Sequence, residues 1–479
     1  MVNYPKTNFF QKPGKTFLFF SSIAVIIVLF SAGIPFFWDN VSISEYICFY
    51  LDDSFQTLIP PIDADFGALT LNAYYVAACC ALFGKSLIVC HLAIVPFVLG
   101  ILWEIKNISL KFIKPGYLPL IYLLLLFDPA FITQLLLMGY DIYLLYFVLL
   151  AIRTLLEKKY FLYSLSLLFL AAISFRAMFF IPGLALIHAI LLFFYEKSRP
   201  GKSEVLVYIP CIVFLICWSV FHYEKTGWVA INPANIVHST LNGFQMGFRQ
   251  FVYVIWKITD SGRIAHWLFC IVCFFAFYKK FRLAKNLKII ILFLFIPLCV
   301  NCIIMIFLSN PIGHKYFLQT FIFLSILTVY FIQKINSKKI QILASVLILL
   351  FLFTGNFIFY PQKYGNAWET SLKVLPYFSI EKDLKAYVKQ QNINPEEVFT
   401  YYPITNNHKY TYLQDDFGYA DADKIELYKC PYFIVSNVYN IRNPEEINNA
   451  AKDWLLLKHF SKGQVYMTLY KNPAVGVTE

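Results

Sequence analysis

Long apolar segments, separated by short clusters of lysine and arginine, run through the first three quarters of the chain. Most of them approach the ~20 residues that an α-helix needs to cross a hydrocarbon core. We therefore predict a mainly α protein, a polytopic helical membrane bundle with about eleven spans. The predicted spans cover residues 16–35, 86–105, 117–137, 141–156, 160–175, 177–195, 204–222, 264–278, 289–308, 316–333 and 340–359.

Two intervals between the spans are longer than the rest. Residues 36–85 form a polar, acidic loop that contains a short apolar run at 68–83. We expect this run to be a helix lying along the membrane interface, because a crossing would place Lys106 and the lysines after it on the side opposite to the other basic clusters. Residues 223–263 form a second long loop that is less apolar than its neighbours.

The basic residues predict the orientation. Lys6, Lys12 and Lys15 precede the first apolar segment, which is too long for a signal peptide and is followed by no small-residue cleavage site. Because cytoplasmic loops carry the excess of lysine and arginine, the N-terminus is predicted to be cytoplasmic and Asp39 external. We expect a multi-pass protein of the inner (plasma) membrane whose C-terminal region faces the periplasm or exterior.

The last 120 or so residues differ in composition from the rest. They hold half of the acids of the chain in a quarter of its length and alternate between helical and strand-like patterns. We predict two domains, a transmembrane domain at 1–359 and a small extracytoplasmic α/β domain at 360–479. The expected helices of the second domain are 381–391 and 444–459, and its expected strands are 398–402, 432–436 and 465–470.

Composition supports a membrane protein. Of the 479 residues, 59% are hydrophobic and 14% are charged, whereas soluble domains carry roughly 25% charged residues. The net charge of +12 lies largely in short loops, which indicates anchoring in a lipid bilayer and not nucleic-acid binding. The eleven cysteines form no disulfide framework, and we interpret the two CxxC spacings inside apolar segments as packing positions.

Ionisable residues recur at the predicted outer ends of the spans, where they are costly unless they are used. If the helix ends meet, carboxylates could act as bases and cations could hold an anionic head group. The alternative interpretation is solvated acids and cations that reach the lipid surface. The candidate catalytic residues are Asp39, Asp141 and Asp65, and the candidate substrate-binding residues are Arg176, His314, Lys315, Tyr316, Lys85 and Asp63.

Motifs of nucleotide-driven and hydrolytic enzymes are absent. The chain has no P-loop, HExxH, GxSxG or dinucleotide fingerprint in a credible context. A transporter or lipid flippase with an external partner-binding domain is an alternative, although no internal repeat with paired broken helices supports it. An assembly protein is a third possibility. Acids gathered in one outward cavity would favour an enzyme, and acids at the bilayer midplane would favour a transporter.

Short segments at the outer helix ends resemble the GT-C superfamily of membrane glycosyltransferases, in particular its protein-mannosyltransferase and aminoarabinose-transferase branch. The resemblance covers essentially the whole chain in layout. One departure concerns the loop, where many members have Gly-His-Pro-Pro in place of Phe66-Gly67-Ala68-Leu69. The segments are Trp38-Asp39, Asp63-Ala64-Asp65, Met138-Gly139-Tyr140-Asp141, Gly313-His314-Lys315-Tyr316-Phe317-Leu318 and the stretch from Tyr360-Pro361 to Trp368.

The resemblance implies transfer of a sugar from a polyprenyl-phosphate-linked donor to a hydroxyl group of a lipid, glycan or protein acceptor. It implies that Asp39 is the general base, with Asp65 and Asp141 as further catalytic acids. Asp141 would orient the acceptor, or bind a divalent metal if one is used, although the reaction requires none. Arg176 and Lys315 would hold the phosphate.

The predicted orientation can be tested by cysteine labelling of intact cells. A cysteine at Asn407 should react with a membrane-impermeant maleimide, and one at Asn336 should not, because only the first lies on the predicted outer side. The unsubstituted protein measures the background from its own cysteines. Labelling at Asn336 but not at Asn407 would contradict this topology.

Overall fold

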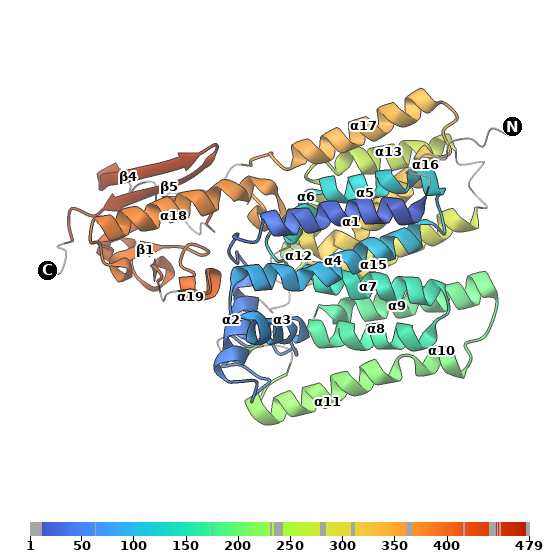
Figure 1. Cartoon of the computed structure of the whole chain (residues 1–479), viewed down its shortest axis with the longest axis horizontal. Coiled ribbons are helices and arrows are strands. Elements are labelled where there is room, and N and C mark those ends of the chain that lie inside the picture. Colours follow the sequence, from blue (N-terminus) through green and yellow to red (C-terminus); the bar gives the residue numbers. More distant parts are fainter. Residues whose placement is uncertain are drawn as a thin grey trace.

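Most of the helices of the chain run side by side in one bundle, and a small sheet lies beyond one end of it together with α18 (Leu375–Gln390) and α19 (His408–Thr411) (Figure 1). The structure is a computed structural model, and it describes residues 12–62, 64–174, 176–229, 232–233, 243–277, 284–307, 312–360, 366–414, 417–439, 447, 449 and 452–475.

Seven helical stretches of the described chain are long and apolar enough to cross a membrane, and each coincides with a predicted span. Serine side chains begin two of them: Ser86 accepts a hydrogen bond from the Val89 amide, and Ser337 accepts one from the Ile340 amide. The stretches are α1 (Pro13–Phe30), α4 (Leu87–Ser109), α9 with η3 (Ala177–Ile190 and Leu191–Glu196), α10 with α11 (Lys202–Leu206 and Ile209–Thr226), α15 (Lys285–Phe307), η5 with α16 (His314–Phe317 and Leu318–Ile332) and α17 (Lys338–Gly355).

The predicted span 117–137 is bent by 67° between α5 (Leu118–Phe127) and α6 (Pro129–Leu136), after the short η2 (Pro115–Tyr117). Asp128 ends the first helix and caps the second, accepting hydrogen bonds from the amides of the second and third residues beyond it at 3.0 and 3.1 Å. Proline at the first position of α6 favours a new helix there. The break therefore has a local cause in the sequence.

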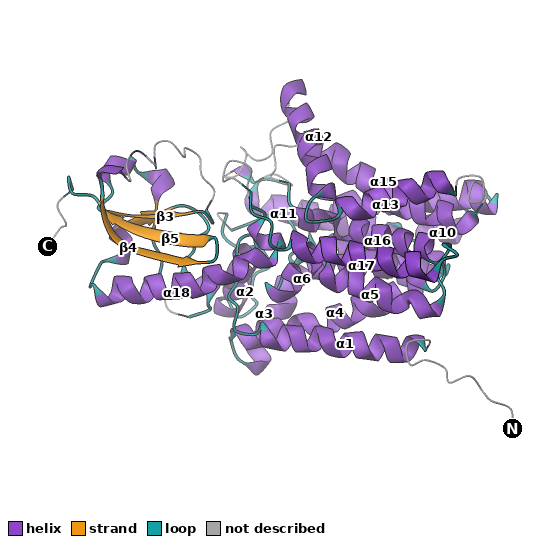
Figure 2. Ribbon diagram, turned by 90° about the horizontal axis from the view of Figure 1, so that it is seen from above, coloured by secondary structure: helices purple, strands orange, loops and turns teal. Residues whose placement is uncertain are grey.

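A second bent pair replaces part of the predicted loop 223–263. Its helices are α12 (Phe244–Thr259) and α13 (Ile264–Ala276), bent by 86°, and α12 points away from the bundle (Figure 2). The expected loop is therefore wrong over α12. At the bend, Gly262 lies against α17 so closely that a Cβ atom would stand 1.9 Å from the Phe351 carbonyl oxygen.

Four shorter helices complete the membrane part. The predicted spans 141–156 and 160–175 correspond to α7 and α8, of 16 and 14 residues. Counting each bent pair as one span raises the seven stretches to nine, two fewer than the predicted eleven, because α7 and α8 are shorter than the length that a span requires. The predicted interfacial run is α3, whose 13 residues are too few to cross a bilayer. The four are α2 (Asn40–Asp52), α3 (Leu71–Phe83), α7 (Asp141–Leu156) and α8 (Tyr160–Ile173).

The C-terminal part is a mixed five-stranded sheet with the order β2-β1-β3-β5-β4. Strand β1 pairs in parallel with β2 and β3, and β5 pairs antiparallel with β3 and β4. Its elements are η7 (Trp368–Thr370), η8 (Leu372–Val374), α18 (Leu375–Gln390), η9 (Pro395–Glu397), β1 (Val398–Thr400), α19 (His408–Thr411), β2 (Ala420–Asp421), η10 (Ala422–Lys424), η11 (Leu427–Lys429), β3 (Tyr432–Ser436), β4 (Leu455–Lys462) and β5 (Val465–Lys471).

The predicted strands at 398–402, 432–436 and 465–470 and the helix at 381–391 all match this domain. The predicted helix at 444–459 matches only in part, because the described residues 447, 449, 452 and 453 are helical but those from 455 onward are not. Residues 455–459 belong to β4, which pairs with β5 through an antiparallel ladder. Backbone pairing with β5 outweighs the helical pattern of these residues, because strand formation depends on contacts with a neighbouring strand more than on local preference. The positions 444–446 lie outside the described residues.

Aromatic residues join the two parts of the chain. Phe37 packs against Tyr377 and Phe378 of α18, with ring centroids 5.1 and 5.5 Å apart. Trp38 lies 5.4 Å from Tyr402, edge to face. Phe37 is thus part of the hydrophobic core of the C-terminal domain, and the chain just before Asp39 is held by that domain.

Candidate active site

Lys315 stands at the centre of a cluster of charged residues at the end of the bundle nearest the sheet. Its Nζ atom lies 2.7 Å from Asp39 Oδ2 and 2.7 Å from Glu369 Oε2, and its side chain is 0% exposed. These three residues come from the loop after α1, from η5 and from η7. A buried ammonium is stable only with such partners, so the lysine joins three distant segments.

Arg176 and Asp141 form the second half of this cluster. Arg176 Nη1 lies 2.8 Å from Asp141 Oδ1, and the guanidinium is stacked between Tyr140 and Tyr316, 4.5 Å from the centroid of each ring. The close contact is not aligned as a hydrogen bond: both Nη atoms of Arg176 and Oδ2 of Asp141 are buried without a hydrogen-bond partner among the described residues. The guanidinium therefore keeps donors for a ligand.

Burial and neighbouring charges act differently on two of the acids. Burial raises the pKa of Asp39, but the Lys315 ammonium and the Arg176 guanidinium outweigh it and hold this pKa below its usual value. Burial raises the pKa of Glu369 to about 7, with Asp39 adding to the effect and Lys315 opposing it. Asp39 is therefore ionised at neutral pH, and its side chain is still 39% exposed, so that a substrate can reach it.

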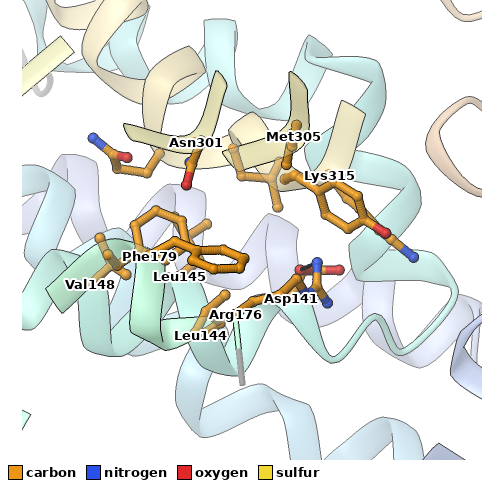
Figure 3. Close-up of a pocket in the computed structure, with 13 residues that line it drawn as sticks. Asp141, Leu144, Leu145, Val148, Arg176, Phe179, Asn301, Met305 and Lys315 are labelled. Atoms are coloured by element: carbon orange, nitrogen blue, oxygen red, sulfur yellow. Dashed lines mark ion pairs between the residues drawn. The ribbon is translucent and has the colours of Figure 1, made fainter. Parts of the chain in front are cut away.

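A pocket runs from this cluster into the bundle. Its mouth is polar, with Arg176 and Asp141 meeting at one end (Figure 3). Its inner wall is mainly apolar and carries only two amides, on Asn301 and Gln319. In this structure the cavity is small, about 20 Å³, which is room for about one water molecule. The apolar wall is formed by Leu144, Leu145, Val148, Phe179, Phe180, Met305 and Leu318.

His314 precedes Lys315 but does not line the pocket. It is buried, with Nε2 3.0 Å from Asp260 Oδ2 and Nδ1 3.2 Å from Thr370 Oγ1. Both ring nitrogens are used, so the expected role in substrate binding has no free atom to serve it. The ring instead connects η5 to the α12–α13 turn and to η7, and so holds the backbone on either side of the Lys315–Glu369 contact.

The structure does not bring Asp65 to this cluster. Asp65 is 2% exposed, and Oδ2 lies 2.8 Å from His222 Nε2 on α11, while Oδ1 accepts a hydrogen bond from the Gly67 amide at 2.8 Å. It fixes the loop 36–85 against α11. Lys85 is exposed and lies near Cys48 and Cys80. Asp63 lies outside the described residues.

Glu369 is the site residue that the sequence analysis missed. The signal was available, because Glu369 follows the last span as Asp39 follows the first, with a tryptophan directly before each. What could not be read from the sequence is that Gly313 lets the carboxylate approach: a Cβ atom there would stand 3.3 Å from Glu369 Oε1. In the described part of the chain, no group of three His, Cys, Asp or Glu residues is placed to hold a metal ion.

The fold is that of solved ArnT structures, in agreement with the predicted resemblance, and the protein is an integral membrane protein. Two crystal structures of ArnT from Cupriavidus metallidurans, an aminoarabinose transferase, match 96% of this chain and 99% of their own at 12% identity. The TM-score is 0.56 for the structure bound to undecaprenyl phosphate and 0.51 for the apo state. No protein-family model and no curated protein sequence matches the chain.

Replacing Glu369 by Gln should change how stability depends on pH. The folded pKa of about 7 lies above the ordinary 4.5, so the folded protein binds the proton more tightly than the unfolded chain between these values. Stability from this proton is fully present below pH 4.5 and is lost as the pH rises through about 7. Thermal unfolding in detergent should therefore show the Tm of Glu369→Gln rising relative to wild type from pH 4.5 to 7.

The exposed Glu396 of η9 provides the matched control, because Glu396→Gln removes a carboxylate from the solvent-exposed surface of the C-terminal domain. A Tm difference for Glu369→Gln that stayed constant over this range, or that fell, would show that the folded protein does not hold a proton on Glu369.

Proposed function

We propose that the protein is a membrane glycosyltransferase that moves a sugar from a polyprenyl-phosphate-linked donor to a hydroxyl acceptor on the outer face of the inner membrane. The observation that carries the proposal is the buried Arg176 guanidinium, which has unused hydrogen-bond donors beside Lys315 and the carboxylate of Asp39. Arginine and lysine together suit a phosphate, and a nearby carboxylate suits a hydroxyl proton.

In the proposed reaction, Asp39 accepts the proton of the acceptor hydroxyl as its oxygen bonds to the anomeric carbon of the sugar. The bond between that carbon and the phosphate oxygen breaks, and the lipid phosphate leaves with the electron pair. Arg176 and Lys315 stabilise the charge that develops on the phosphate. Asp141, in contact with Arg176, orients the guanidinium and the acceptor. No nucleotide is consumed, because the lipid phosphate is the leaving group.

Lys315 is shared between the base and the leaving group. While it contacts Asp39 at 2.7 Å, it keeps the carboxylate ionised but lowers its affinity for a proton. A phosphate that draws the ammonium away from Asp39 strengthens the base when the donor is in place. In this proposal the donor binds first, because Asp39 becomes a strong enough base to take the hydroxyl proton only after Lys315 has moved toward the phosphate.

The shape and polarity of the pocket support an amphiphilic donor. Charged groups stand at the mouth, and apolar side chains line the interior that continues between α7, α9, α15 and α16. The cavity of about 20 Å³ is too small for a sugar ring, so the donor has to displace side chains such as Phe179 or Met305. The ArnT structure bound to undecaprenyl phosphate has the same fold, which supports a polyprenyl phosphate as the lipid.

The position of the charges supports an enzyme over a transporter. Asp39 follows α1, Asp141 begins α7, Arg176 precedes α9, and Lys315 and Glu369 lie just outside α16 and α17. All five are at helix ends on the side of the bundle that carries the sheet, whereas a transporter places its site near the bilayer midplane. Profiling of lipid-linked sugars in cells with and without the gene would identify the donor and acceptor.

Arg176→Ala and Lys315→Ala should each weaken donor binding. Losing a charge-assisted contact to phosphate costs on the order of 1.5–3 kcal/mol, or roughly tenfold or more in Kd. Binding of polyprenyl phosphate to the purified protein measures this, with Tm recorded for each variant. Lys158→Ala, at an exposed lysine paired with Glu196, is the control. Unchanged affinity in both variants would exclude these cations from donor binding.

Asp39→Asn should abolish most of the transfer activity. The amide keeps the size of the side chain but cannot take a proton, and a positioned base contributes about 10²–10⁴-fold. We expect kcat to fall by that order, while expression and binding of polyprenyl phosphate persist. The assay uses purified protein, a polyprenyl-phosphate sugar and a candidate acceptor. Asp52→Asn, an exposed acid of the same loop, should retain activity, and full activity of Asp39→Asn would remove Asp39 from the mechanism.

A further inference from the structure

Asn40, directly after Asp39, connects the segments that carry two acids of the candidate site, Asp39 and Asp141. Its side chain is buried, with the residue 1% exposed. Nδ2 donates a hydrogen bond to the Leu137 carbonyl at 3.2 Å, and Oδ1 accepts one from the Tyr140 amide at 3.4 Å. Both contacts lie in the short turn between α6 and α7, and this turn ends at Asp141.

The two turns that meet at Asn40 are both held in an uncommon backbone conformation. Trp38, directly before Asp39, has φ 54°, and Met138, three residues before Asp141, also has φ 54°. Bulky residues in this left-handed region are strained and persist only where surrounding contacts hold them. Asn40 supplies such contacts to both turns at once, since it belongs to the first and bonds the backbone of the second.

The two turns are joined in two ways, by apolar packing within the C-terminal domain and by the hydrogen bonds of the Asn40 amide. Phe37 and Leu137, one from each turn, are both part of the hydrophobic core of that domain. Apolar packing holds the turns together but is not directional. The Asn40 amide adds one donated and one accepted hydrogen bond, which are directional contacts between the two backbones.

We propose that Asn40 is a positioning residue for the transfer reaction, setting the distance between the Asp39 carboxylate and the Asp141–Arg176 pair. The inference rests on the proposed function, since it assumes that these groups act on one substrate. A base about 1 Å out of place can cost about 10²-fold in rate. Asn40 itself touches no pocket atom and needs none for this role.

Asn40→Ala should therefore lower kcat by about 10- to 100-fold and leave the KM for the donor within about twofold, because the phosphate-binding cations are unchanged. Asn356→Ala is the matched control: Asn356 is also buried, donates to the Leu352 carbonyl at 3.3 Å and accepts from the Leu372 amide at 3.4 Å. A loss of stability alone would affect both variants alike, whereas a positioning role affects kcat only in Asn40→Ala.

Asn40→Asp gives a second readout, in the pH profile. When protonated, the carboxyl keeps both hydrogen bonds, donating to Leu137 and accepting from Tyr140; when ionised, it loses the donor and faces the carbonyl oxygen. The ratio of its kcat to that of wild type should fall as the pH rises. A ratio that is independent of pH, together with wild-type kcat in Asn40→Ala, would overturn the proposal.

A cryo-EM structure of Asn40→Ala separates this inference from the proposed function. It should show residues 38–40 displaced relative to residues 137–141, with no such displacement in Asn356→Ala. If wild-type protein shows no transfer at all, the proposed function fails and this structural comparison alone decides the role of Asn40. Unmoved turns in Asn40→Ala would refute it whatever the activity.

Discussion

The buried ammonium of Lys315 is the interaction on which the arrangement of the site depends. Its side chain is 0% exposed and lies 2.7 Å from carboxylates of Asp39 and Glu369. A buried charge that loses a partner is strongly destabilising, so the loop after α1, the start of α16 and the segment beyond α17 have to meet around it. The same contacts that hold these three segments together at this end of the bundle also assemble the charged cluster.

The C-terminal domain is a structural part of this cluster. The chain from Phe36 to Trp38 is packed against this domain. The Phe36 amide donates a hydrogen bond to the Thr411 carbonyl at 2.9 Å, and the Phe37 side chain is part of the hydrophobic core of the domain. Trp38 meets the ring of Tyr402. Asp39 therefore stands between a membrane helix and a packed sheet domain, which hold its position from both sides, as the proposed role of a base requires.

The inner part of the pocket is lined mainly by apolar side chains, and such surroundings restrict where charged groups can be placed. Polar backbone and side-chain groups in the hydrocarbon region need partners within the protein, and the five charged groups of the cluster lie instead at helix ends. The described polar groups deeper in the pocket are the amides of Asn301 and Gln319. A polar mouth above an apolar interior is the division that an amphiphilic lipid phosphate requires.

The sequence by itself determined most of the membrane helices and their order, because apolar length and basic loops respond to the bilayer as a solvent. It also identified Asp39, Asp141, Arg176 and Lys315, because an ionisable residue at a helix end is conspicuous. Only the tertiary structure decided which of these residues meet. The pairing of Asp65 with His222 and the approach of Glu369 to Lys315 both depend on contacts between segments far apart in the chain, and no local pattern of residues records such contacts.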